Sequence, residues 1–330
     1  MRYVVYGAGA IGGIIGARLH EAGHDAALIC RGAHLDAVRD RGITIRTPDA
    51  EVTIAVPAVG RPGDLNFTRD DVVFLAMKTQ DTDAALRELV AVSPPDIAVI
   101  CAQNGVANER LALRRFSRVY GMLVMMPGTL LDPGIVLNHA SNAWGVLDAG
   151  CYPTGTDALI ARVTADLTAA GFSSRTEPSI MRWKYAKLLS NLNNAFGAAC
   201  GADARAPEFL AAVRAEAVAC YRAAGIDCAS DEEVAARRRE SDVRYGAIEG
   251  ARRDGGSSWQ SLARGLPTIE TDYLNGEIVL LGRTHGVPTP CNELLQRVAN
   301  EMAREGRSAG SLPVEELVRL AESGVQAGTS

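Results

Sequence analysis

Residues 2–12, RYVVYGAGAIG, decide the fold of the N-terminal half of the chain. An apolar, β-rich run leads directly into Gly7, and a helical pattern follows the glycines. In G-x-G-x-x-G, the first glycine permits a tight turn, the second lets the backbone approach a pyrophosphate, and the third lets the helix pack closely on the strand. The helix N-terminus attracts phosphate through its free N–H groups. The stretch therefore predicts a dinucleotide site, and the alternative is a glycine turn without a ligand. The residues of the predicted site are Gly7, Ala8, Gly9, Ala10, Ile11 and Gly12.

The rest of this half alternates strand-like and helical segments. Further strands are expected at residues 25–30, 71–77, 97–102, 118–124 and 135–140, and a helix at 156–171. Repeated βαβ units specify a mostly parallel, doubly wound sheet. From about Pro178 the strand signals stop, and helical segments follow at 180–199, 207–224, 231–249, 267–285 and 291–305. We predict an α/β protein with a Rossmann-like dinucleotide-binding domain over 1–177 and an all-α domain over 178–330.

Composition restricts the class of protein. A hydrophobic fraction of 47% and a charged fraction of 22% are those of a soluble globular chain. The net charge of -5 argues against nucleic acid as a partner, and we interpret Arg237, Arg238 and Arg239 as a solvated helix face. The sequence contains no apolar run of about 18 residues or more, so no membrane-spanning helix is predicted. These properties are compatible with a homodimer.

Seven scattered cysteines, with no Cys-x-x-Cys pair, favour reduced thiols, and no signal peptide is visible. We therefore expect a cytoplasmic protein. His20 and His24 are four residues apart, but Gly23 should end the helix between them and no third ligand is evident, so no metal site is predicted. We interpret His139 and His285 as structural.

The end of the second strand indicates which cofactor binds. An NAD-preferring site places Asp or Glu there to hold the ribose 2′-hydroxyl. Residues 29–32 read Ile-Cys-Arg-Gly, so Arg31 is present and a carboxylate is not. A guanidinium suits a 2′-phosphate, which favours NADPH over NADH. The alternative is an ordinary surface arginine.

Two further loops follow predicted strands, at residues 77–80 and 102–105. Ligands of open α/β sheets bind at the carboxyl ends of the strands. Lys78 is a candidate for a ribose or a substrate carboxylate, and Asn104 is a candidate for a hydrogen bond near the nicotinamide. Both residue types are also common in ordinary turns.

The helical segment WKYAKLLSNLNN, residues 183–194, contains three asparagines, which are mediocre helix formers. At about 100° per residue, Asn191 and Asn194 lie within about 40° of Lys187, whereas Asn193 lies elsewhere. This stripe carries no acidic residue. It is either a solvated face or a face that binds substrate.

Taken together, these residues resemble the ketopantoate reductase (2-dehydropantoate 2-reductase) family. The resemblance covers nearly the whole chain and rests on GAGAIG, MKTQ, QNG, the Lys187 helix, SSWQ…IETDYLNGEI and HGVPTP, in that order. It implies a Rossmann domain, a helical C-terminal domain, a site in the cleft, and reduction of a small 2-keto acid with NADPH. By position, Lys187 resembles the catalytic lysine and Glu270 the glutamate that closes on cofactor and lysine. The resemblance also implies that Asn191 and Ser258 contact substrate, and that Lys78 and Asn104 lie on the cofactor side.

The sequence departs from the family pattern at the second asparagine, where Ala195 stands. Asn194, one residue earlier, is a candidate to replace it in binding substrate. Ser261, Leu262 and Ile269 also differ from the family pattern. The expected function is NADPH-dependent reduction of a 2-keto acid, with ketopantoate as the default substrate. The alternatives are a reductase of the same fold that acts on another carbonyl or imine, and an NADPH-binding sensor without catalysis.

Overall fold

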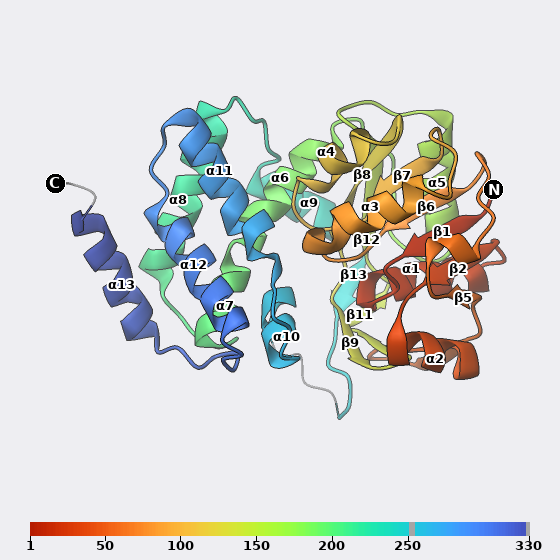
Figure 1. Ribbon diagram of the computed structural model, residues 1–330, viewed down its shortest axis with the longest axis horizontal. Coiled ribbons are helices and arrows are strands. Elements are labelled where there is room, and N and C mark those ends of the chain that lie inside the picture. Colours follow the sequence, from red (N-terminus) through yellow and green to blue (C-terminus); the bar gives the residue numbers. More distant parts are fainter. Residues whose placement is uncertain (251–254, 328–330) are drawn as a thin grey trace. The chain divides into compact units, whose positions relative to one another are not determined.

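The computed structural model describes residues 1–250 and 255–327 (Figure 1). The chain forms two compact units. The N-terminal unit comprises Met1–Lys184 and the described part of residues 229–252, and the C-terminal unit comprises Tyr185–Cys228 and the described part of 253–330. The contiguous division at 177/178 that the sequence predicts differs from these units, because a segment from the second half of the chain packs with the first half.

A seven-stranded sheet forms the centre of the N-terminal unit, in the order β12-β8-β7-β6-β1-β2-β5. All neighbours are parallel except β12 and β8. The strands are β1 (Tyr3–Tyr6), β2 (Ala26–Ile29), β5 (Ala58–Val59), β6 (Val72–Leu75), β7 (Ala98–Cys101), β8 (Arg118–Met125) and β12 (Val146–Cys151). Strand order reverses direction beside β1, which has β2 on one side and β6 on the other. This arrangement confirms the predicted doubly wound fold and places a topological switch point at the end of β1.

Helices cover both faces of this sheet. They are α1 (Ala10–Glu21), α2 (Gly32–Arg41), α3 (Thr82–Val90), α4 (Asn108–Leu113) and α5 (Ala158–Ala169), with short 3₁₀ turns at Pro62–Asp64 and Thr79–Asp81. Val5 of β1 belongs to one apolar cluster and Val4 to another, because successive strand residues point to opposite faces. The strands therefore read as continuous apolar runs, as parallel strands buried on both faces do.

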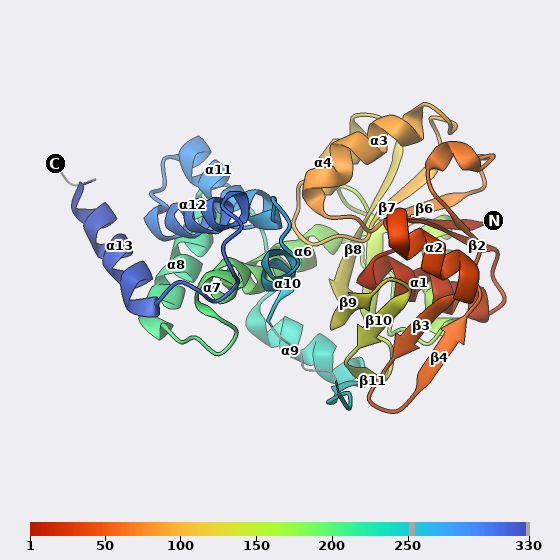
Figure 2. The same ribbon diagram turned by 60° about the horizontal axis from the view of Figure 1, so that its bottom comes forward.

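A second, four-stranded sheet has the order β4-β3-β10-β9. Its strands are β3 (Ile43–Arg46), β4 (Glu51–Ile54), β9 (Gly128–Asp132) and β10 (Ile135–Asn138). It packs on α1 (Figure 2). Of the strand expected at 135–140, residues 135–138 thus belong to this sheet and not to the central one. The reason is the hairpin at Gly134, which adopts a φ of +82° and returns the chain beside β9.

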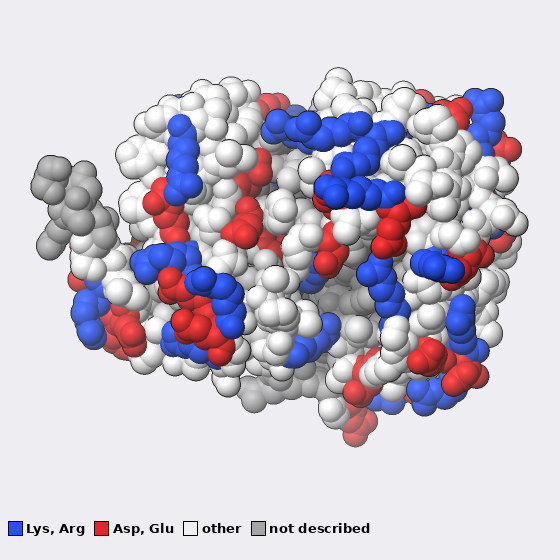
Figure 3. Space-filling view, viewed as in Figure 1, with Lys and Arg blue, Asp and Glu red and all other residues white. Residues whose placement is uncertain are grey.

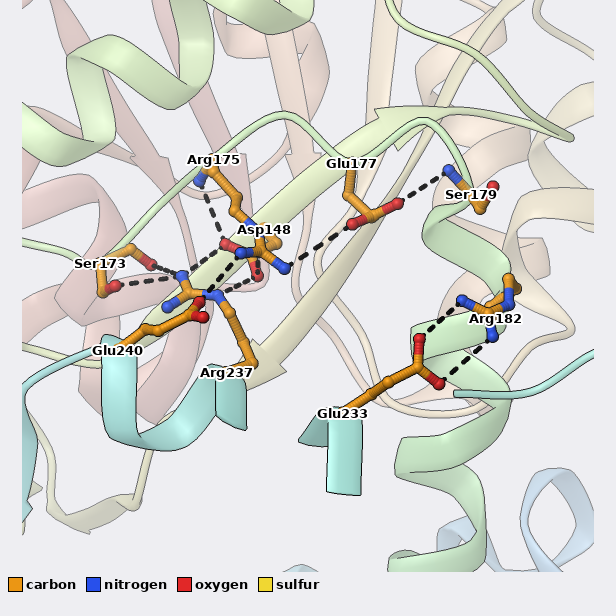
Figure 4. A network of polar contacts seen from close by, with 9 residues as sticks. All are labelled: Asp148, Ser173, Arg175, Glu177, Ser179, Arg182, Glu233, Arg237 and Glu240. Carbon is orange, nitrogen blue, oxygen red and sulfur yellow. Dashed lines mark hydrogen bonds and ion pairs between the residues drawn. The ribbon is translucent and has the colours of Figure 1, made fainter. Parts of the chain in front are cut away.

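The segment that returns to the N-terminal unit contains α9 (Asp231–Glu240) and β13 (Val243–Tyr245), which pairs with β11 (Ala140–Asn142). Arg237 of α9 is buried and forms two hydrogen bonds to Asp148 of β12, at 2.6 and 2.7 Å. Figure 4 shows this pair, and at the other end of α9 the pair of Glu233 with Arg182 at 3.1 Å. The interpretation of Arg237 as a solvated residue was therefore wrong, whereas Arg238 and Arg239 are exposed.

The C-terminal unit is helical, as predicted. Its helices are α7 (Asn193–Cys200), α8 (Pro207–Ala223), α10 (Ser257–Ala263), α11 (Asn275–His285), α12 (Pro290–Arg304) and α13 (Val314–Ala327), with a 3₁₀ turn, η3, at Glu270–Tyr273. The division between the units falls within α6 (Ile180–Asn191), after Lys184. Asn275 and Asn292, both buried, hydrogen-bond to each other at 3.1 Å within the helical core.

Several helix boundaries differ from the predictions. The helix expected at 180–199 is interrupted at Leu192, whose carbonyl accepts a hydrogen bond from the Asn275 side chain at 3.1 Å. The helix expected at 231–249 ends at Glu240, because the chain there enters β13. The helix expected at 267–285 begins only at Asn275. Helix α13 was not predicted.

Among the described residues, no helix is both long and apolar enough to cross a bilayer. On the face shown in Figure 3, acidic and basic side chains are interspersed, and basic side chains gather most over α3 and α4.

Candidate functional site

The glycine-rich loop lies between β1 and α1, and its glycines are there for different reasons. Gly7 has a φ of +95°, and a Cβ there would lie 2.5 Å from the Met77 nitrogen. A Cβ at Gly12 would lie 2.5 Å from the Gly7 oxygen. A Cβ at Gly9, in contrast, would meet no atom of the described residues within 4 Å. The fold therefore needs Gly7 and Gly12, whereas the space above Gly9 is left open, where a pyrophosphate would approach.

The carboxyl ends of the central strands are level with one another. Tyr6 of β1 is paired with Ile29 of β2 and with Leu75 of β6, which in turn is paired with Cys101 of β7. The loops that carry the glycines, Arg31, Lys78 and Asn104 therefore leave the sheet along one edge. This is the edge where open α/β sheets bind ligands.

Buried amides connect the loops of Lys78 and Asn104. Gln103 donates to the Met77 carbonyl at 2.9 Å and to the Thr82 hydroxyl at 2.8 Å. Asn108 donates to the Thr79 hydroxyl and to the Asn104 carbonyl, both at 3.1 Å. The structure thus brings these two predicted loops together and holds both in fixed positions.

Lys184 contacts the loop that carries Gln103 and Asn104. Its ammonium lies 2.7 Å from the Glu109 carboxylate and donates to the Gln103 carbonyl at 2.8 Å, and both charged side chains are buried. A buried ion pair is tolerated when hydrogen bonds satisfy its remaining donors, and two further carbonyls lie within reach of this ammonium. Lys184 is therefore a positioning residue for the loop, which the sequence did not reveal.

His34 also contacts the glycine-rich loop, and no sequence pattern pointed to it. Its Nδ1 accepts a hydrogen bond from the Gly134 N–H at 2.9 Å. Its Nε2 lies 2.7 Å from the Ala8 carbonyl, which can only accept, so Nε2 carries the proton. The neutral tautomer of His34 therefore links the loop to the β9–β10 hairpin. Burial lowers the pKa of His34 below 6.5, although the bond to Ala8 acts in the opposite direction.

Arg31 lies at the end of β2, as predicted, but it has a partner. Its guanidinium lies 3.2 Å from the Glu88 carboxylate of α3 and 3.4 Å from the Tyr6 hydroxyl. Tyr6 in turn donates to Glu88 at 2.5 Å. The pKa of Tyr6 is raised, mainly by burial and then by this bond to a carboxylate.

The remaining predicted residues belong to the C-terminal unit. Lys187 and Asn191 lie on α6, Asn194 on α7, Ser258 on α10 and Glu270 on η3. The Oδ1 of Asn194 lies 2.8 Å from where a Cβ of Gly256 would be, so Asn194 packs against the start of the helix that carries Ser258. Ala195 is buried in the apolar core. Asn194 and Ser258 are thus brought close in space.

Three buried polar atoms in this unit have no hydrogen-bond partner among the described residues. They are Nδ2 of Asn191 and the hydroxyls of Ser257 and Ser258. Asn191 is 4% exposed and Ser258 1%. An unpartnered buried polar group destabilises a fold by about 1–3 kcal/mol, so such groups call for an explanation. A polar ligand would supply the missing partners.

Two family profiles match successive parts of the chain. The profile described as ketopantoate reductase PanE/ApbA matches residues 3–153, and the profile of its C-terminal part matches residues 179–303. The chain belongs to the ketopantoate reductase family. This membership confirms the predicted resemblance and the prediction of an oxidoreductase of the 2-dehydropantoate 2-reductase type.

Relatives match this family member over nearly its whole length. A 2-dehydropantoate 2-reductase of Pyrococcus horikoshii is 27% identical over 320 residues, 94% of this chain and 100% of the relative. One of Archaeoglobus fulgidus is 28% identical, covering 89% of this chain and 95% of its own. A crystal structure of a PanE/ApbA family ketopantoate reductase from Ralstonia eutropha superimposes with a TM-score of 0.77 at 26% identity, covering 93% and 100% of the two chains.

D-Mandelate dehydrogenase, solved with NADH and anilino(oxo)acetate, superimposes on the family member with a TM-score of 0.79. The two sequences are 21% identical, and the match covers 93% of this chain and 99% of the dehydrogenase. At this identity the likeness concerns the fold.

Proposed function

We propose that the protein reduces a 2-keto acid to the 2-hydroxy acid with NADPH, with ketopantoate as the default substrate. The observation that carries the proposal is the set of unpartnered buried groups at Asn191 and Ser258, two positions that resemble the substrate-binding residues of the family. A carboxylate and a hydroxyl offer the acceptors that the Asn191 amide and the Ser258 hydroxyl lack.

The residues of the N-terminal unit fit a dinucleotide. The open space at Gly9 admits a pyrophosphate, and α1 has no side-chain cap that would compete for its free N–H groups. Arg31 supplies a cation at the end of β2 for a 2′-phosphate. When bound there, NADPH supplies the hydride that reduces the carbonyl carbon.

The protein's own residues supply position and charge. Lys187 donates a proton to the carbonyl oxygen as negative charge develops on it, and its cationic form stabilises that charge. Glu270 orients Lys187 and favours its charged state. Asn191, Asn194 and Ser258 hold the carboxylate and hydroxyl groups of the substrate. The product is the 2-hydroxy acid, which has gained one hydride and one proton.

A second candidate is the same reaction on a bulkier 2-keto acid. The observation that favours it is Ala195, which is buried in the core at the position of the family's second asparagine. Because the side chain of residue 195 is directed into the core, the second amide falls to Asn194, which packs against the start of α10. A changed amide position alters which substituents of the keto acid are hydrogen-bonded.

The experiment is steady-state oxidation of NADPH, followed by absorbance, with ketopantoate and a series of larger aliphatic and aromatic 2-keto acids. We expect one 2-keto acid to be reduced with the highest kcat/KM, and its identity decides between the two candidates. Tight binding of NADPH with no oxidation by any 2-keto acid of the series would contradict the proposal.

A further inference from the structure

The end of β2 carries a carboxylate that comes from a distant part of the sequence. Glu88 lies on α3, and its carboxylate contacts Arg31 at 3.2 and 3.3 Å. The Tyr6 hydroxyl donates to the same carboxylate at 2.5 Å. Tyr6 is the last residue of β1 and precedes Gly7, so the contact lies directly beside the glycine-rich loop.

Stability does not explain the contact. The Arg31 and Glu88 side chains are 67% and 45% exposed, and exposed ion pairs contribute about 0–1 kcal/mol at most. Tyr6 differs, because it is buried and its hydroxyl holds the Glu88 carboxylate in one place. A fixed carboxylate therefore lies next to Arg31, a cation at the end of β2 that is suited to a 2′-phosphate.

The two possible cofactors meet this carboxylate differently. A ribose 2′-hydroxyl can donate a hydrogen bond to a carboxylate, which is how Asp or Glu favours NADH. A 2′-phosphate has no such donor when ionised, and it must compete with Glu88 for the Arg31 guanidinium. Like charges held within a few ångströms repel each other, even near water.

We infer that Glu88 sets the balance between NADPH and NADH by competing with the 2′-phosphate for Arg31, which makes it a specificity-determining residue. The inference rests on the proposed function only in that the N-terminal unit binds a dinucleotide. Arg31 favours the phosphate, and Glu88 reduces that preference. A chain in which Glu88 is neutral should discriminate more strongly for NADPH.

The test is calorimetric binding of adenosine 2′,5′-bisphosphate and adenosine 5′-monophosphate to the full-length chain. The two nucleotides share the adenosine and the 5′-phosphate. The ratio of the bisphosphate affinity to the monophosphate affinity therefore reports the contribution of the 2′-phosphate. We expect Glu88→Gln to raise that ratio by about tenfold, which corresponds to about 1.4 kcal/mol. Tyr6→Phe, which frees the carboxylate without changing the charge, should raise it less. The increase should shrink at high salt.

Asp83→Asn is the matched control. It removes one negative charge from the same helix, but Asp83 contacts Arg115 and Arg87, not Arg31. The control should leave the ratio close to that of the unaltered chain. An unchanged or lower ratio in Glu88→Gln, with both nucleotides still bound, would overturn the inference and leave the proposed function intact. Failure of the unaltered chain to bind either nucleotide, NADPH or NADH would overturn both.

Discussion

Arg237 and Asp148 form a bidentate, buried ion pair between α9 and β12, at 2.6 and 2.7 Å, with side chains that are 4% and 1% exposed. Arg237 also donates to the Ser173 hydroxyl at 3.0 Å. Removing one member of a buried pair leaves the other charge without its partner, which destabilises a protein by about 3–5 kcal/mol. The pair therefore holds the returning segment to the N-terminal unit.

We expect Arg237→Ala to lower the unfolding midpoint in urea and in heat, by an amount equivalent to about 3–5 kcal/mol. Arg238→Ala is the control, because Arg238 is the exposed neighbour, and its effect should stay within about 0.5 kcal/mol. Equal midpoints for the two variants would show that the pair contributes nothing to stability.

Gly9→Ala and Gly12→Ala should separate binding from folding. Within the described part of the chain, the Cβ at position 9 meets no atom within 4 Å, so stability should hold. Dinucleotide affinity should fall roughly ten- to hundredfold through loss of phosphate contacts. The Cβ at position 12 would lie 2.5 Å from the Gly7 oxygen, which should destabilise the fold by about 1–3 kcal/mol. Thermal unfolding and cofactor titration measure the two effects. Unimpaired binding by Gly9→Ala would place the pyrophosphate elsewhere.

His34 should make cofactor binding sensitive to acid. Its pKa is lowered from 6.5 in the folded chain, so the folded state favours the neutral imidazole. The contribution of neutral His34 to the stability of the fold is therefore complete above about pH 6.5. As pH falls below this value towards the lowered pKa, protonation turns Nδ1 into a donor that faces the Gly134 N–H, and the link is lost. Dinucleotide affinity should therefore decrease with falling pH. His34→Gln should show a flatter profile over this range, and parallel profiles would contradict the assignment.

Lys187→Ala should reduce turnover by about 10²–10⁴-fold, because the developing alkoxide loses its proton donor. The affinity for NADPH should change little. Stopped-flow measurement of NADPH oxidation and fluorescence titration of the cofactor distinguish the two quantities. Turnover that survives the substitution would refute the role given to Lys187.

Asn191 and Asn193 offer a matched pair two residues apart. Asn191 is buried with an unpartnered Nδ2, whereas Asn193 is exposed. Asn191→Ala should raise the KM for the keto acid about tenfold, the value of one hydrogen bond to a charged group, and Asn193→Ala should leave it unchanged. Similar kinetics for both variants would mean that this face of α6 does not bind substrate.

Local signals predicted the parts of the fold that depend on neighbouring residues. The glycine spacing predicts the loop after β1, and the fully apolar strands predict the sheet edge where Lys78 and Asn104 lie. Each of these signals is contained within a few neighbouring residues. The helix around Lys187 was also recognisable. Its interruption at Leu192 was not, since it depends on the Asn275 side chain, 83 residues away.

Pairing between distant residues could not be predicted from periodicity. Glu88 reaches Arg31 across 57 positions, so the apparent absence of a carboxylate after β2 was true of the sequence and not of the space around it. The run at 237–239 reads as three equivalent arginines, yet within the described residues only Arg237 meets a carboxylate, 89 positions away. His34 binds two backbone groups, which leave no trace in the side-chain pattern.

The return of α9 and β13 also affects how the protein can be synthesised and divided. On the ribosome, Asp148 is synthesised long before Arg237. Until Arg237 emerges, the Asp148 carboxylate of the nascent N-terminal unit lacks its bidentate partner. A fragment that ends at Lys184 would keep this defect permanently. Excising a stable nucleotide-binding module would therefore require grafting residues 229–250 back onto it, because no single cut separates the two units.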